Sequence, residues 1–172
     1  PQVAEDRRLV VVTVHRRESF GEPLRRICRG VRALVDRCPA VEVLWPLHPN
    51  PQVSTPVREE MSGASRVRLV DPLPYPEFVA AMSRAYLVLT DSGGVQEEAP
   101  VLGVPVLVLR DKTERPEAIE AGVARLVGTA PDEIERRAAE LLDQPSLRSR
   151  MAVPCSPFGD GQAARRIVDW LE

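Results

Sequence analysis

Short runs of apolar, mostly β-branched residues alternate along the chain with stretches in which apolar residues recur at helical spacing. The first run, residues 9–14, is nearly continuous, which is typical of a strand buried on both faces of a parallel sheet. Five later runs have the same character, so we expect further strands there. The six predicted strands span residues 9–14, 41–45, 67–70, 86–90, 104–109 and 124–127.

Amphipathic helices are predicted between and after these strands. In the clearest example, apolar residues follow one another at helical intervals from Leu24 to Val35, and Pro23 suits the first turn. Further helical patterns predict helices over residues 76–85, 131–142 and 162–171. Strand and helix therefore alternate over the chain.

Local signals suggest where some of these elements begin. Thr129 and Asp132 are predicted to cap the helix that starts near residue 131. The proline-rich stretch 46–56 is interpreted as a loop, with a helix following it to about residue 61. The first residues, 1–8, are interpreted as a linker that leads into the first strand.

The alternation of strands and helices predicts an α/β protein with an open, parallel sheet and helices on both faces. A length of 172 residues favours one domain over residues 1–172. In such sheets, ligands bind beyond the carboxyl ends of the strands. The residues that follow each strand are therefore the candidates for function.

Composition narrows the classes of partner. The net charge of −2 gives no indication of a nucleic-acid partner, and no apolar run approaches the roughly 20 residues that span a membrane. Three cysteines, Cys28, Cys38 and Cys155, form no CxxC pair, so we expect no metal site. An odd cysteine count without a visible targeting segment fits a reducing cytoplasm.

The strongest local signal is the stretch TDSGGVQEEAP at residues 90–100. A strand ends there, Ser92 is a favourable N-cap, and Gly93 and Gly94 allow a ligand to approach the backbone of a helix N-terminus. Such a turn can bind a phosphate, although an ordinary capped helix explains the pattern equally well. Pro100 should end or kink the helix. The motif is neither a Walker loop nor GxGxxG, so neither ATP nor NAD is implied.

Two charged residues are further candidates, one just after this turn and one after the fifth predicted strand. Glu98 comes four residues after Gly94, on the same helix face, where a carboxylate can accept both hydroxyls of a ribose. Arg115 follows the fifth strand and can reach a diphosphate, because a guanidinium group matches phosphate oxygens. A solvated glutamate and a surface charge cluster are the alternatives.

Both histidines of the chain follow predicted strands. His15 precedes two arginines, of which Arg16 is the first, and His48 lies in the stretch PLHPNP. These positions suit an anionic substrate or proton transfer, although single loop histidines are usually structural. The stretch at 72–78 follows the third strand. It can hold a flat base, or it can be a stiff loop with Phe78 in the core.

Together these stretches resemble the non-hydrolysing UDP-N-acetylglucosamine 2-epimerases. The matching motifs are HRRES at 15–19, HPNP at 48–51, DPLPYPEF at 71–78, TDSGGVQEEAP at 90–100, PVLVLRDKTERPE at 105–117 and PFGDG at 157–161. Ser19 stands where the family usually has asparagine. The resemblance implies two Rossmann-like halves around a cleft, as in GT-B glycosyltransferases. This chain matches the carboxy-terminal half, and the amino-terminal half is missing.

The resemblance also implies roles in nucleotide binding. Residues 92–94 would hold the diphosphate, Glu98 the ribose diol, and Arg115 the phosphates. Leu73, through its backbone, and Phe78 would frame the uracil.

The resemblance further implies a reaction. Elimination of UDP from UDP-GlcNAc would give 2-acetamidoglucal, and re-addition with inversion at C2 would give UDP-ManNAc, without cofactor or metal. His15 would be the catalytic residue of this half, facing the sugar and the leaving UDP. Arg16 and His48 resemble residues of a regulatory site that binds a second UDP-GlcNAc in bacterial members.

Several expectations follow for the protein as a whole. The acid/base carboxylates would lie mainly in the missing half, so this chain alone would bind UDP without turning it over. The complete enzyme would be a homodimer in the cytoplasm. The alternatives are a hydrolysing epimerase of the same superfamily, the donor domain of a GT-B glycosyltransferase, and a non-catalytic UDP-sugar-binding module.

Overall fold

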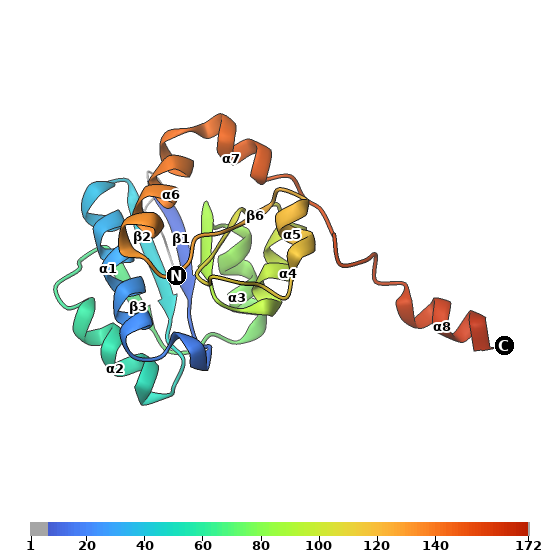
Figure 1. Ribbon diagram of the computed structural model, residues 1–172, viewed down its shortest axis with the longest axis horizontal. Coiled ribbons are helices and arrows are strands. Elements are labelled where there is room, and N and C mark those ends of the chain that lie inside the picture. Colours follow the sequence, from blue (N-terminus) through green and yellow to red (C-terminus); the bar gives the residue numbers. More distant parts are fainter. Residues whose placement is uncertain (1–6, 172) are drawn as a thin grey trace.

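Apolar runs of three to six residues assemble into one parallel sheet with the strand order β3-β2-β1-β4-β5-β6 (Figure 1). The computed structural model describes residues 7–171. Each predicted strand is present, with bounds that differ from the prediction by up to two residues. The strands are β1 (Arg8–Thr13), β2 (Val41–Pro46), β3 (Val67–Val70), β4 (Leu87–Thr90), β5 (Val106–Val108) and β6 (Ala124–Leu126).

Helices cover both faces of the sheet, as the alternating pattern predicts. One face carries α1, α2 and α6, and the other carries α3, α4 and α5 (Figure 1). The helices are η1 (Arg17–Ser19), α1 (Glu22–Arg37), α2 (Pro51–Glu60), α3 (Tyr75–Ser83), α4 (Gly93–Val101), α5 (Pro116–Glu120), α6 (Pro131–Asp143), α7 (Pro145–Met151) and α8 (Ala163–Leu171). The predicted fold class, an open parallel α/β sheet, is confirmed.

The position of β1 at the centre of the sheet explains why its sequence is continuously apolar. Val10 and Val12 belong to the hydrophobic core beneath α1, α2 and α6. Leu9 and Val11 belong to the second core, beneath α3, α4 and α5. Because successive side chains of a strand point to opposite faces, a strand buried on both sides needs an apolar residue at every position.

The strand order reverses between β1 and β4. The chain leaves β1 toward α1 on one face of the sheet and leaves β4 toward α4 on the other face (Figure 1). The two loops therefore diverge at the carboxyl ends of neighbouring strands. In open α/β sheets this switch point is where ligands bind.

The loop predicted over residues 46–56 is wrong from residue 51 on, because α2 already begins at Pro51; the helix predicted to end near residue 61 is present and ends at Glu60. The side chain of Asn50 caps this helix by accepting a hydrogen bond from the amide of Gln52 at 2.9 Å. Pro51 occupies the first turn, where its missing N–H is not needed. Pro56 lies inside the helix and costs it one backbone hydrogen bond.

Three smaller predictions also need correction. The N-cap of α6 is Ala130 without a side-chain hydrogen bond, so neither Thr129 nor Asp132 caps it. Helix α7 was not predicted. The predicted linker 1–8 lies mostly outside the described residues, and its last residue, Arg8, begins β1 because its amide bonds to Ala40 O at 2.7 Å.

Helices α1 and α6 pack closely on one face of the sheet. A Cβ atom at Gly30 would lie 3.0 Å from both Ile134 Cβ and the carbonyl oxygen of Pro131. Glycine at this position of α1 therefore allows the two helices to approach. Ile134 itself is fully buried.

Helix α8 is confirmed as a helix, but its apolar stripe packs on no other part of residues 7–171. The helix projects away from the body of the fold (Figure 1), and none of its residues is buried. Trp170 is 84% exposed, and Ile167, Val168 and Leu171 are also exposed. Burial therefore gives α8 no stability within this chain.

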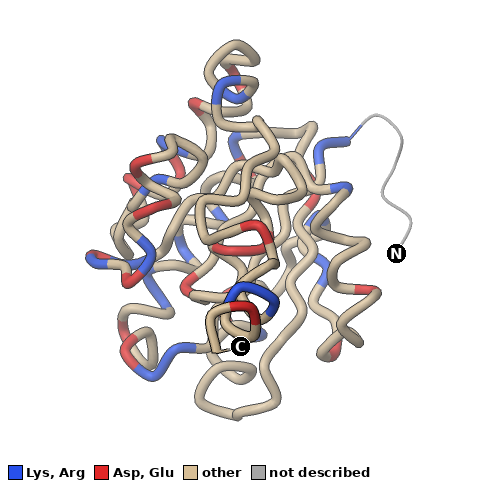
Figure 2. Tube along the Cα trace, turned by 90° about the vertical axis from the view of Figure 1, so that its right-hand side faces the viewer, with Lys and Arg blue, Asp and Glu red and all other residues tan. Residues whose placement is uncertain are grey.

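Charged residues of both signs are interspersed along the chain rather than gathered on one face in the view of Figure 2. This arrangement agrees with the small net charge. Within residues 7–171, no helix combines the length and the apolar character that crossing a bilayer requires.

A chain that ends at residue 161, and so lacks α8, should keep its free energy of unfolding within about 0.5 kcal/mol, because the helix buries no side chain. Urea unfolding measures this quantity. A chain that ends at residue 144 is the control, because it also loses Leu147 and Met151, which are buried. It should be destabilised by about 2 kcal/mol or more. A large loss on removing α8 alone would show that the helix packs against the body.

Gly30→Ala should destabilise the protein. The new methyl group would press on the backbone of α6, and overpacking costs about 1–3 kcal/mol, which exceeds the gain of up to about 1 kcal/mol in helix propensity. The melting temperature measures the difference. Arg26→Ala, at a part-exposed position of the same helix, is the control. A rise in melting temperature for Gly30→Ala would contradict the close packing of α1 and α6.

Candidate functional site

Asp91 joins the loops that follow β1 and β4. Its side chain is fully buried and accepts hydrogen bonds from the amide of His15 at 3.1 Å and that of Arg16 at 2.9 Å. The hydroxyl of Ser19 donates a third bond at 2.8 Å. A buried carboxylate is tolerated only when donors compensate its lost hydration. These bonds therefore hold the His15–Ser19 loop against the end of β4.

The turn after Asp91 presents the N-terminus of α4. Ser92 occupies the N-cap position, and its amide donates to Thr90 Oγ1 at 2.9 Å. The predicted capping bond from the Ser92 side chain is absent, so that part of the prediction is wrong. The first amides of a helix have no partner within the helix, and they point out of its N-terminus. Ser92 and these amides therefore supply hydrogen-bond donors at the carboxyl end of β4.

Arg16 lies over this turn. A Cβ atom built on Gly93 would stand 3.1 Å from Arg16 Nη2, so the guanidinium group covers the glycine directly. Arg16 Nη1 lies 3.7 Å from Glu114 Oε1, which is an ion pair rather than a hydrogen bond. The turn thus combines helix amides with a positive charge.

Glu98 lies one helical turn further along α4, as predicted. Its Oε1 would be 3.9 Å from a Cβ atom at Gly94, which places both residues on one face of the helix. Glu98 also lines a hollow of about 330 Å³ together with Tyr75 of α3 and Phe158 of the PFGDG stretch. The structure therefore brings the PFGDG motif next to Glu98.

Arg115 lies on the loop after β5, but its guanidinium group already has partners. It forms an ion pair with Glu97 of α4 and donates to the carbonyl oxygen of Glu114 at 3.0 Å. Its amide bonds to Thr113 Oγ1 at 3.0 Å. Of the two arginines near the turn, Arg115 is the more fully engaged.

A buried amide side chain links the loop after β5 to the turn. Gln96 is fully buried, accepts a hydrogen bond from Thr113 Oγ1 at 2.5 Å and donates to the carbonyl oxygen of Ser92 at 3.1 Å. Gln96 is not among the residues predicted from the sequence. A polar residue on the inward face of a short helix is the signal that would have identified it.

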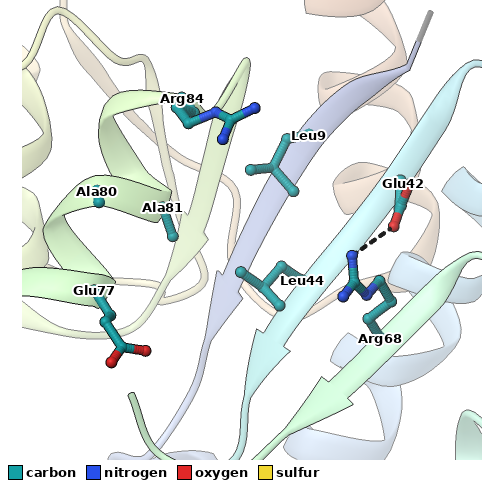
Figure 3. Close-up of a pocket in the computed structure, with 8 residues that line it drawn as sticks. All are labelled: Leu9, Glu42, Leu44, Arg68, Glu77, Ala80, Ala81 and Arg84. Carbon is teal, nitrogen blue, oxygen red and sulfur yellow. Dashed lines mark hydrogen bonds and ion pairs between the residues drawn. The ribbon is translucent and has the colours of Figure 1, made fainter. Parts of the chain in front are cut away.

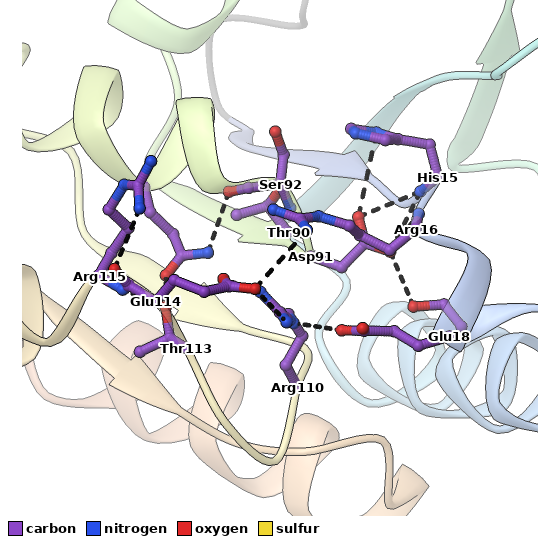
Figure 4. A network of polar contacts seen from close by, with 12 residues as sticks. His15, Arg16, Glu18, Thr90, Asp91, Ser92, Arg110, Thr113, Glu114 and Arg115 are labelled. Carbon is purple, nitrogen blue, oxygen red and sulfur yellow. Dashed lines mark hydrogen bonds and ion pairs between the residues drawn. The ribbon is translucent and has the colours of Figure 1, made fainter.

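Arg110, which was also not predicted from the sequence, links charged residues of the loops that follow β1 and β5 (Figure 4). It is buried and forms ion pairs with Glu18 of η1 and Glu114. Hydrogen bonds from Arg110 are the main cause that lowers the pKa of Glu114 from 4.5 to about 2, and the pKa of Arg110 is raised in turn. Arg110 lies two residues after the end of β5, as His15 does after β1, so the rule that singled out His15 would also have found it.

The remaining predicted residues lie together in a hollow of about 200 Å³ beside the turn. His15, His48, Leu73 and Phe78 all line it. The two imidazole rings are stacked, with centroids 6.0 Å apart and planes inclined by 25°. The structure thus brings His48, which was predicted for a regulatory site, next to the residues predicted for catalysis and base binding.

Another hollow, of about 350 Å³, lies on the sheet surface beside α3 (Figure 3). Its floor includes Leu9 and Leu44, and an ion pair between Arg68 and Glu42, at 3.4 Å, lies at one side. None of the predicted site residues lines this hollow. It is nevertheless larger than the two hollows that the predicted residues line, so size alone does not locate the candidate site. Among residues 7–171, no group of three or more metal-ligating side chains is assembled.

Comparison with known proteins identifies the family. The sequence profile of the family described as UDP-N-acetylglucosamine 2-epimerase matches residues 1–172. The UDP-N-acetylglucosamine 2-epimerase of Escherichia coli K12 is 44% identical over 172 residues, which are 100% of this chain and 46% of the relative. The enzyme of the same name from Campylobacter jejuni is 41% identical over 170 residues, which are 99% of this chain and 44% of the relative.

Solved structures agree with this result. The Neisseria meningitidis UDP-GlcNAc 2-epimerase bound to UDP-GlcNAc superimposes with a TM-score of 0.94 at 40% identity, covering 98% of this chain and 46% of that one. The S. aureus MnaA structure with UDP gives a TM-score of 0.91 at 39% identity, covering 96% and 46%. This chain spans less than half the length of these relatives. It belongs to the UDP-N-acetylglucosamine 2-epimerase family.

Proposed function

We propose that this chain is the UDP-binding half of a non-hydrolysing UDP-GlcNAc 2-epimerase, and that alone it binds UDP without turning it over. The observation that carries the proposal is the convergence of His15, Arg16 and the 92–94 turn at the switch point of the sheet. Relatives with the same fold are known with UDP and with UDP-GlcNAc. Their names support the same ligand class here.

The diphosphate would lie at the N-terminus of α4. The helix dipole contributes only about 0.3–1 kcal/mol to anion binding, so direct hydrogen bonds must supply most of the affinity. Amides of the first turn and the hydroxyl of Ser92, which does not cap the helix, are the donors. Gly93 and Gly94 carry no side chain that would keep phosphate oxygens away.

The nucleoside would extend from this turn toward α3. Glu98 would accept hydrogen bonds from both ribose hydroxyls, because a carboxylate has two acceptor oxygens. The uracil would lie by Leu73 and Phe78, in the hollow that these residues share with His15. Tyr75 and Phe158, which line the hollow next to Glu98, would form a further wall.

The reaction would use the diphosphate as a leaving group. A proton leaves C2 and the bond between C1 and the phosphate oxygen breaks, which gives 2-acetamidoglucal and UDP. The C–O bond then re-forms while C2 receives a proton on its opposite face, which gives UDP-ManNAc. His15 would face the sugar and the departing UDP. Donors that are already oriented toward the diphosphate stabilise the charge that develops there.

The part of the relatives that this chain does not cover limits what the chain would do by itself. The carboxylates that move the C2 proton are expected in the other half of the protein, and the cleft would lack its opposite wall. A UDP-sugar-binding module without catalysis is therefore the second candidate for the isolated chain. Its supporting observation is that the chain spans 44–46% of the length of the relatives described above.

Calorimetric titration of this chain with UDP should detect binding that Glu98→Ala and Arg115→Ala each weaken, because each removes a proposed contact with the nucleotide. Arg136→Ala is the matched control for Arg115→Ala, since Arg136 also pairs with a glutamate but lies on α6, far along the chain from these motifs. A folded parent that binds no UDP would mean that the site requires both halves or that the motifs are wrongly assigned.

Ser92→Ala should weaken UDP binding while changing the free energy of unfolding by less than about 0.5 kcal/mol, because its hydroxyl makes no capping bond. Asn50→Ala, which removes a true cap, should cost about 1 kcal/mol and leave UDP binding unchanged. Urea unfolding and calorimetry measure the two effects. An equally large loss of stability for Ser92→Ala would show that its hydroxyl caps α4 in solution.

A further inference from the structure

We propose that Arg16 is a further ligand of the UDP diphosphate and that Asp91 is the positioning residue that holds it over the α4 N-terminus. The inference rests on the proposed function, because it concerns the same nucleotide site. It assigns Arg16 to the reaction site, whereas the sequence analysis placed it in a separate regulatory site. It also explains why a fully buried carboxylate lies at the switch point of the sheet.

The environment of Asp91 indicates a positioning role. Its carboxylate is 0% exposed, and its one ion-pair contact among residues 7–171 is with Nδ1 of His15 at 4.0 Å, which is too long for a hydrogen bond. Compensation comes instead from two consecutive amides and one hydroxyl, all on the His15–Ser19 loop. Because the amide of Arg16 itself is one of the donors, Asp91 determines where the Arg16 side chain begins.

The guanidinium group of Arg16 ends at the place where an anion would bind. Its Nη2 lies 3.1 Å from the position that a Cβ atom would occupy on Gly93, which is the first residue of α4. No hydrogen bond from this guanidinium to the described residues is present, and its side chain is 36% exposed. Its N–H donors can therefore turn to a phosphate without breaking an existing hydrogen bond.

The neighbours of Arg16 favour this exchange. Its one ion-pair partner among the described residues, Glu114, is itself held by two hydrogen bonds from Arg110 at 2.5 and 2.9 Å. Glu114 is therefore fixed in place, and its 3.7 Å contact with Arg16 is a partly exposed pair of little strength. Arg115, in contrast, is already engaged by Glu97. Arg16 is the arginine with the greater capacity to bind phosphate.

A double-mutant cycle tests the two assignments together. UDP and uridine are titrated into the 172-residue parent chain, Arg16→Ala, Asp91→Asn and the double variant, with Arg17→Ala as the matched control. Arg17 is the adjacent, exposed arginine. We expect Arg16→Ala to lower UDP affinity roughly tenfold or more, the usual effect of losing a charged hydrogen bond. Uridine affinity should stay unchanged in Arg16→Ala, and Arg17→Ala should behave like the parent.

The cycle separates positioning from general structural damage. If Asp91 acts through Arg16, the double variant should bind UDP as Arg16→Ala does, because the second change has nothing left to remove. Losses that add, or an equal loss of uridine binding in Asp91→Asn, would overturn the positioning role. Unchanged UDP affinity in Arg16→Ala would overturn the phosphate role. Should Asp91→Asn not fold, Ser19→Ala, which removes one of the three bonds to Asp91, replaces it in the cycle.

A second measurement keeps this inference separate from the proposed function. Inorganic pyrophosphate is titrated while the amide resonances of Gly93 and Gly94 are followed by NMR. A response that disappears in Arg16→Ala supports the anion site even if the parent binds no UDP, which would then count against the nucleotide function alone. A folded parent whose glycine amides do not respond to pyrophosphate would overturn the assignment of Arg16.

Discussion

The hydrogen bonds that Asp91 accepts join the two loops between which the strand order reverses. The pairing of β1 with β4 brings these two loops close together, and the hydrogen bonds fix one loop against the other. With them, His15 and Arg16 are held against the N-terminus of α4. The cost of burying the carboxylate is offset by donors that all come from one loop, so the charge orders that loop.

A second set of charged residues connects the loop after β1 to the loop after β5, at the carboxyl ends of the strands. Glu18 follows β1, Arg110 and Glu114 follow β5, and Arg110 pairs with both carboxylates. Buried Gln96 forms a parallel link of neutral hydrogen bonds between Thr113 and Ser92. Loops from three strands are thereby held together, and such a rigid framework can position donors for a ligand before the ligand arrives.

The fold forms a complete sheet although the chain spans less than half the length of its relatives. Residues of this chain form the whole sheet and both hydrophobic cores, whereas the relatives of known structure are more than twice as long. The hollows that contain the candidate residues open at one edge of the sheet, and the amphipathic helix α8 packs on nothing within residues 7–171. Within residues 7–171, a nucleotide bound there, as proposed above, would have protein on one side only.

The sequence alone determined the strands, most helices and the family, because local periodicity and short motifs are properties of neighbouring residues. It also predicted the 92–94 turn, Glu98 and His15 as candidate site residues, because His15 and the turn come just after predicted strands and Glu98 lies on the helix that follows the turn. It missed the start of α2, where a proline-rich composition concealed a helix capped by Asn50.

Only the tertiary structure decided how side chains pair across the site. Asp91 contacts residues 75 and 76 positions away, and Arg110 contacts Glu18 at a separation of 92. Local patterns do not specify which strands become neighbours, and the strand order is what brings these loops together. The same reason applies to Arg16, whose position over Gly93 follows from the pairing of β1 with β4.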